Sequence, residues 1–173
     1  MENKAAILAA SLFANSADLS LVLGRDAAMA YRPKIQPKQV SLSGRRDLML
    51  HFLTSAGLAL TNGPERAGKV GLEKELSDSR GGSGFSFVDL TANRAGIQLA
   101  LTATAFTEEA LLIQTRMSRI KKDIEIMPST AGLPEGLSES EFIRRFKNTE
   151  SKSFLRISKT IDERIIHCPV YWQ

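Results

Sequence analysis

Cysteine and histidine are scarce in this 173-residue chain, which has one cysteine and two histidines. A single cysteine excludes an internal disulfide framework and any zinc module built from several cysteines. Two histidines leave little room for a histidine-rich metal site. The 12 glycines and 6 prolines are too few for a low-complexity chain. Because 43% of the residues are hydrophobic, the chain can instead bury a real core.

Long apolar runs are also missing, and none reaches the ~20 residues that a membrane-spanning helix needs. The longest candidate, residues 95–106, is interrupted by Gln98, Thr102 and Thr104. The N-terminal residues 1–17 allow two interpretations. Their apolar stretch has the length of a signal-peptide core and ends in small residues, but the charged start is incomplete because Glu2 offsets Lys4. An ordinary first helix at about 3–15 is the favoured prediction.

Basic and acidic residues are mixed along the chain rather than separated into runs of one sign, although the formal net charge is +4. Proteins that bind nucleic acid usually concentrate basic residues and interleave them with aromatic ones. Here Arg116, Arg119 and Lys121 are followed closely by Asp123 and Glu125. Such mixing is typical of a solvated helix face, so we expect no nucleic-acid partner.

Helical patterns dominate, and they predict one all-α domain over residues 1–173, a compact irregular bundle of about six to seven helices without a substantial sheet. A core region at 43–106 is followed by a helical extension at 107–173. The predicted helices cover about 3–15, 43–60, 64–77, 87–104, 107–124, 138–146 and 151–166, with a further short stretch at 18–31. Pro64 suits a first helical turn, and Ser86 and Ser138 are expected N-caps.

Two details of the extension are specific. The stripe Ala110, Ile113, Met117, Ile120 and Ile124 has the spacing of one inward helix face. Near the C-terminus, Cys168 is expected to pack rather than react, and Tyr171 and Trp172 are expected to dock onto the domain.

Polar side chains recur at helical spacing in the most apolar part of the chain. Asp47, His51 and Ser55 share one face of the helix at 43–60, Glu75 and Asp78 end the next, and Asp89, Asn93 and Gly96 share a face of the third. An unpaired buried polar group costs ~1–3 kcal/mol, so these groups should meet one another or reach a wet cleft. Short loops make the three helices neighbours. We therefore expect His51, Glu75, Asp89 and Asn93 to converge.

Such a cluster allows several roles. Carboxylates beside a histidine suit general acid–base chemistry, with Glu75, His51 and Asp89 as candidate catalytic residues. Asp78, Ser83 and Asn93 are the candidate binding residues. One histidine with two acids can also hold a divalent metal weakly, but no metal or cofactor is expected. A polar network that acts in structure or binding is the leading interpretation.

The glycine-rich loop at 81–86 resembles a phosphate loop only superficially. It lacks the lysine followed by Ser or Thr, and no strand precedes it. A turn that lets helices pack closely is the favoured interpretation, with a bound anion at the following helix start as the alternative.

Four segments carry a resemblance to known proteins. They are HFLTSA at 51–56, GLEKELSDS at 71–79, GSGFSFVDL at 82–90 and ANRAG at 92–96. In order and spacing they resemble the YfiM-like group of small bacterial envelope lipoproteins and, more distantly, the VanZ-like family, over about residues 47–100. The resemblance implies a periplasmic or envelope-associated helical protein with a cell-envelope polymer or protein as partner, and it implies no reaction. The chain lacks a lipobox cysteine near its start.

A second likeness is to lysozyme-like transglycosylases, which place a catalytic glutamate at a helix end before a Ser/Gly-rich loop. Glu75 and residues 79–86 match that outline. This likeness implies the alternative function, a hydrolase of a cell-envelope polymer with Glu75 as general acid.

Overall fold

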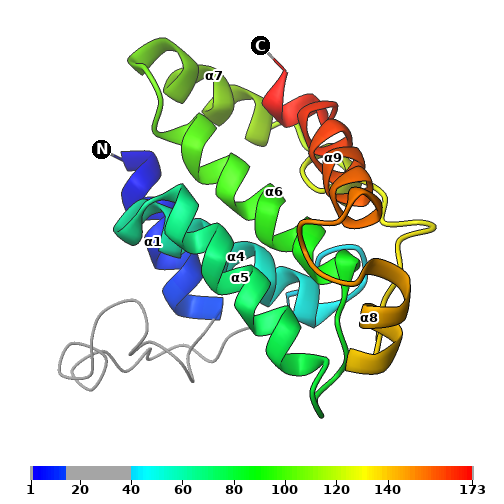
Figure 1. Ribbon diagram of the computed structural model, residues 1–173. Coiled ribbons are helices and arrows are strands. Elements are labelled where there is room, and N and C mark those ends of the chain that lie inside the picture. Colours follow the sequence, from blue (N-terminus) through cyan, green and yellow to red (C-terminus); the bar gives the residue numbers. More distant parts are fainter. Residues whose placement is uncertain (1, 15–39, 173) are drawn as a thin grey trace, which may run out of the picture.

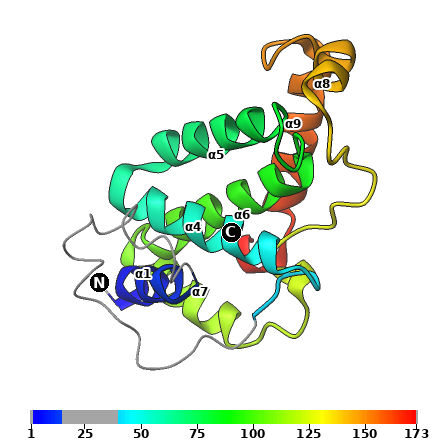
Figure 2. The same cartoon turned by 90° about the horizontal axis from the view of Figure 1, so that it is seen from below.

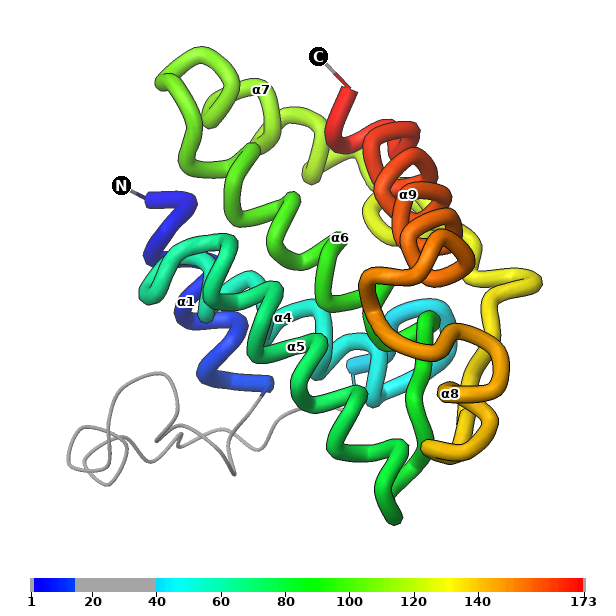
Figure 3. Tube along the Cα trace, viewed as in Figure 1, coloured from blue at the N-terminus to red at the C-terminus, as the bar shows by residue number. Residues whose placement is uncertain are grey.

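The computed structural model describes residues 2–14 and 40–172, and over these residues the protein is all-α, as predicted. Figure 1 shows the helices and Figure 3 follows the chain. The elements are α1 (Glu2–Ala14), α4 (Arg46–Asn62), α5 (Pro64–Asp78), α6 (Phe87–Ala103), α7 (Thr107–Met117), η1 (Asp123–Glu125), α8 (Glu139–Phe146), α9 (Lys152–Ile166) and η2 (Pro169–Tyr171). No strand forms in the described ranges, which contain two isolated bridges. The predicted stretch at 18–31 lies outside them.

Helix α6 is the centre of the bundle, because its sequence is apolar nearly all round. It packs against α1, α4, α5, α7 and α9. In Figure 1 it crosses the molecule diagonally, with α4 and α5 on one side and α9 on the other. Figure 2 shows α5 and α1 on opposite sides of α4. The residues predicted to carry polar chemistry therefore lie on three helices in mutual contact.

Gly96 sets the closeness of α4 and α6. A Cβ atom at this position would lie 2.0 Å from the backbone oxygen of Phe52. Only glycine allows such an approach between the backbones of two helices. The polar residues of α4 and α6 are consequently brought within side-chain reach of each other.

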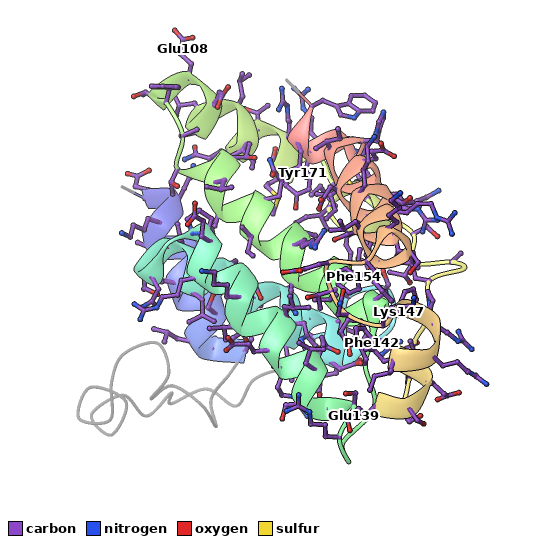
Figure 4. The ribbon with its side chains drawn as sticks, in the orientation of Figure 1. Glu108, Glu139, Phe142, Lys147, Phe154 and Tyr171 are labelled. Carbon is purple, nitrogen blue, oxygen red and sulfur yellow. The ribbon has the colours of Figure 1, made fainter. Side chains whose placement is uncertain are left out.

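Five phenylalanines join the C-terminal helices to the start of α6. Their ring centroids are separated by 4.5 to 6.3 Å, and the residues are Phe85, Phe87, Phe142, Phe146 and Phe154. Figure 4 shows Phe142 and Phe154 where α8 and α9 meet the body. The larger of the two hydrophobic clusters in the described residues thus includes residues from Leu42 to Tyr171.

Several helix signals in the sequence work as predicted. Pro64 opens α5, and the Ser86 side chain accepts the backbone N–H of Asp89 at the start of α6. Ser138 and Glu141 form a reciprocal capping box at α8. Helix α4 begins at Arg46 rather than near Ser43, because Ser43 and Gly44 adopt positive φ angles of 53° and 74° in a tight turn.

The long helix predicted at 107–124 is wrong beyond Met117. The Glu125 carboxylate accepts the backbone N–H groups of Lys121 and Lys122, which stabilises a separate turn instead of a continued helix. Ile113 is buried, but Met117 and Ile124 are exposed, so the stripe does not face inward along its length.

Both ends of the described chain contact the body of the bundle. At the N-terminus α1 packs on α4, where the Ser11 hydroxyl donates to the carbonyl of Leu53 at 2.7 Å. No helix within the described ranges is long and apolar enough to cross a lipid bilayer. At the other end Tyr171, which is labelled in Figure 4, is buried as predicted. Its hydroxyl lies 3.0 Å from the Ala95 carbonyl. Trp172 was predicted to dock but is exposed, and its indole N–H donates to the carbonyl of His167.

Cys168 is buried, in agreement with a packing role. Burial raises the pKa of its thiol to about 11, so the reactive thiolate is disfavoured at neutral pH.

Candidate functional site

His51 enters the site from the middle of α4, one turn from Ser55. The side-chain oxygen Oδ1 of Asn93, on α6, lies 3.2 Å from Nδ1 of His51. The same oxygen accepts a hydrogen bond from the Ser55 hydroxyl at 2.9 Å. Asn93 thereby fixes the orientation of the imidazole ring and favours a proton on Nδ1.

Glu75 reaches the same point from the last turn of α5. Its side chain is completely buried, and Oε2 accepts the backbone N–H of Ser86 at 3.1 Å. The other carboxylate oxygen, Oε1, lies 4.0 Å from Nδ1 of His51 and has no hydrogen-bond partner. The loop at 79–86 creates this geometry because it returns the chain beneath the end of α5.

Asp89 lies in the first turn of α6. Its Oδ2 atom is 3.8 Å from Nε2 of His51, on the side of the ring away from Asn93. Its Oδ1 atom lies 3.7 Å from the guanidinium of Arg45 and makes no hydrogen bond. One carboxylate oxygen of Asp89 therefore faces His51, and the other faces Arg45 at the edge of the domain.

These four residues, His51, Glu75, Asp89 and Asn93, form what we call the polar cluster. The predicted convergence is confirmed, since ligand atoms of His51, Glu75 and Asp89 all lie within 4.8 Å of one another. Three buried polar atoms of the polar cluster lack hydrogen-bond partners: Oε1 of Glu75, Oδ1 of Asp89 and Nδ2 of Asn93. Buried polar atoms are usually paired, so this concentration of unpaired atoms in one place is informative.

The electrostatics of the polar cluster follow from burial. Loss of solvent, together with the nearby charge of Asp89, raises the pKa of Glu75 to about 8. Burial also raises the pKa of Asp89, while His51 and Arg45 oppose that change. Because two carboxylates are buried close together, uptake of a positive charge stabilises the polar cluster.

The side chains of the polar cluster differ in their exposure to solvent. The side chain of His51 is 21% exposed and that of Asp89 is 10% exposed, whereas that of Glu75 is 0% exposed. Arg45 lies beside Asp89 at the rim, where it pairs with Asp47 and Glu135. A molecule arriving from solvent would meet His51 and Asp89 first, with Glu75 behind them.

Asp78 and Ser83, predicted as binding residues, are not part of the polar cluster. The Asp78 carboxylate accepts hydrogen bonds from Lys74 and from the Ser83 hydroxyl, and its carbonyl accepts the N–H groups of Gly82 and Gly84. These contacts close the loop at the end of α5. Their role is to hold the chain that carries Ser86 to Glu75.

The glycine-rich loop is a packing turn in this structure. Gly84 has a φ angle of +89°, and a Cβ atom there would lie 2.4 Å from the backbone of Gly136. The neighbouring Phe85 exchanges backbone hydrogen bonds with Leu137. This geometry agrees with the favoured interpretation of the loop.

Three contributors to the site were missed from the sequence: Arg45, Ser86 and Gly71. Ser86 was seen only as a helix cap, yet its N–H also holds Glu75. Gly71 lies where a Cβ atom would approach Nδ2 of Asn93 to 2.8 Å, so a larger residue would displace the amide. Arg45 reaches Asp89 through the tight turn at 42–45, which no spacing rule indicates.

Comparison with known proteins gives no match: no family model, no curated protein and no solved structure is significantly similar to this chain.

Proposed function

We propose that this is a bacterial, envelope-associated binding protein whose polar cluster takes up a small positively charged ligand. One observation carries the proposal: Oε1 of Glu75 and Oδ1 of Asp89 are buried acceptors without hydrogen-bond partners. A network that served only to align helices would satisfy its own atoms, because each unpaired group costs ~1–3 kcal/mol. The unpaired oxygens therefore support a ligand rather than a purely structural role.

The sign of the ligand's charge follows from the residues present. Two carboxylates face one imidazole, and Arg45 approaches Asp89 only at the rim, at 3.7 Å. Within the described residues, no lysine or arginine forms an ion pair with Glu75. A cation would supply the compensation that the Glu75 carboxylate lacks and would add to that of Asp89.

The envelope association rests on the resemblance of residues 47–100 to the YfiM-like group, and a periplasmic or envelope location follows from it as part of the proposal. Cell fractionation of a bacterium that makes the protein tests it. Recovery in the periplasmic or membrane fraction is expected, whereas recovery with cytoplasmic markers alone would contradict it.

A hydrolase acting on a cell-envelope polymer is the second candidate. It is favoured by the position of Glu75 at the end of α5, before the Ser/Gly-rich loop, with His51 4.0 Å away. Against it, the Glu75 side chain is completely buried, and a general acid must come within hydrogen-bond reach of the substrate. Clearing of a cell-wall suspension by the full chain, abolished in Glu75→Gln, would support the hydrolase; no clearing would exclude this polymer as its substrate.

The binding proposal is tested by NMR of the chelator-treated full chain with 15N-labelled histidine. The chain has two histidines, so His167 at the end of α9 is an internal control, and His167→Ala assigns the signals. Zinc chloride, magnesium chloride and methylammonium chloride serve as cation probes, and sodium acetate as an anion probe. At least one cation should shift the His51 signals alone. Equal shifts at both histidines, or none with any cation, would contradict the proposal.

A further inference from the structure

We propose that the polar cluster is a site for a divalent transition metal, such as Zn²⁺, with His51, Glu75 and Asp89 as its ligands. The inference rests on the proposed function and names the class of ligand. One atom from each of the three residues lies within 4.8 Å of the other two, although the residues come from three different helices. Imidazole nitrogen combined with carboxylate oxygen is a donor set that Zn²⁺ and similar metals accept.

The separations fit ligands around a common centre better than hydrogen-bonded partners. Nε2 of His51 lies 3.8 Å from Oδ2 of Asp89. Oε1 of Glu75 lies 4.0 Å from Nδ1, which is the ring nitrogen that faces Asn93 and would not bind the metal. Hydrogen bonds of these types are shorter, at about 2.7–3.2 Å. Two ligands bound tetrahedrally at about 2.0–2.2 Å from a zinc ion are roughly 3.4 Å apart. Ligand atoms of the three residues already lie within 4.8 Å of one another, and a movement of the Glu75 carboxylate toward Nε2 would complete the site.

The orientation of His51 points to the same conclusion. Oδ1 of Asn93 lies 3.2 Å from Nδ1, so the second ring nitrogen, Nε2, is the one that faces Oδ2 of Asp89, at 3.8 Å. A metal ion between these two atoms would be bound by both. A histidine ligand whose other nitrogen donates to a carbonyl oxygen is the usual arrangement at metal sites.

Supporting contacts hold two of the three ligands, Glu75 and His51, in place. Oε2 of Glu75 is fixed by the N–H of Ser86, which leaves Oε1 free to bind. Asn93, which orients His51, is itself held by the Ser55 hydroxyl.

A bare metal fits the observations better than an organic ammonium ion or a hard cation. Glu75 is fully enclosed, so a ligand that must reach Oε1 has to be small. Mg²⁺ and Ca²⁺ prefer sites made of oxygen alone, and Mg²⁺ also keeps several of its waters. The imidazole nitrogen shifts the preference toward transition metals.

The test is isothermal titration of the chelator-treated full chain with zinc chloride. The wild type should bind one Zn²⁺ per chain. Glu75→Gln, Asp89→Asn and His51→Gln should each weaken binding at least about tenfold, the smallest loss typical even for supporting residues at metal sites. Glu73→Gln, which changes an exposed carboxylate of α5, and His167→Ala are matched controls and should bind as the wild type does. Zinc should also raise the melting temperature of the wild type, and of no cluster variant.

The outcomes separate the two proposals. Wild-type affinity in all three cluster variants, or loss of binding in either control, would overturn the metal site. Circular dichroism with chelator present identifies any variant that fails to fold, and the remaining variants then decide. If Zn²⁺ does not bind but methylammonium shifts the His51 signals, the metal inference fails and the binding proposal stands. If no cation probe shifts these signals, both fail.

Discussion

Replacement of Glu75 by glutamine should remove much of the loss of stability that the metal-free protein undergoes as the pH rises. Burial and the charge of Asp89 raise the pKa of Glu75 from an ordinary 4.5 to about 8 in the folded chain. The folded state therefore holds a proton that the unfolded state releases. This contribution to the free energy of unfolding is fully present below pH 4.5 and is lost as the pH rises through 8.

The size of the effect follows from the same shift. Each pKa unit corresponds to about 1.4 kcal/mol, so the contribution of Glu75 has a ceiling of roughly 5 kcal/mol. Domains of this kind are stable by only ~5–15 kcal/mol, so the loss would be easy to measure. Glutamine has the same shape and cannot ionise. Some pH dependence should remain in Glu75→Gln, because burial also raises the pKa of Asp89.

Urea unfolding at pH 5, 7 and 9, with chelator present, measures this difference. The wild type should lose several kcal/mol more than Glu75→Gln between pH 5 and 9. Glu141→Gln is a suitable control, because hydrogen bonds from Ser138 lower the pKa of Glu141 and its contribution changes only in acid. Parallel curves for the wild type and Glu75→Gln would refute the reasoning.

Three substitutions test the packing. Gly96→Ala would place a Cβ atom 2.0 Å from the backbone oxygen of Phe52, so urea unfolding should show a loss of more than about 3 kcal/mol; an unchanged midpoint would contradict the close contact of α4 and α6. Tyr171→Phe removes a buried hydroxyl that bonds the Ala95 carbonyl and should cost ~1–2 kcal/mol by the same method, whereas no change would mean that this hydroxyl is not needed. Ser138→Ala removes the cap of α8 and should lower the free energy of unfolding by ~1 kcal/mol, with wild-type stability as the contradicting result.

Much of the fold was predictable because local signals and packing agree. Pro64, Ser86 and Ser138 start helices where their chemistry suits a first turn, and the apolar sequence of α6 correctly predicts its burial. The convergence of the polar cluster followed from helical spacing and short loops. Helix starts, helical spacing and loop lengths are all determined by residues that are close together in the sequence.

The predictions that were wrong or missing concern contacts that helical spacing does not describe. The stripe after Met117 has helical spacing, but the carboxylate of Glu125 stabilises a different turn. Arg45 approaches Asp89 only because the turn before α4 directs it there. Oε1 of Glu75 lacks a hydrogen-bond partner because of how the three helices pack, and no residue pattern could indicate it.

A crystal structure of the zinc-soaked protein, with diffraction data collected on both sides of the zinc absorption edge, tests the metal site most directly. One anomalous peak is expected within about 2.2 Å of ligand atoms from His51, Glu75 and Asp89. A density map in which zinc binds only at other residues, with these three side chains turned away from one another, would contradict it.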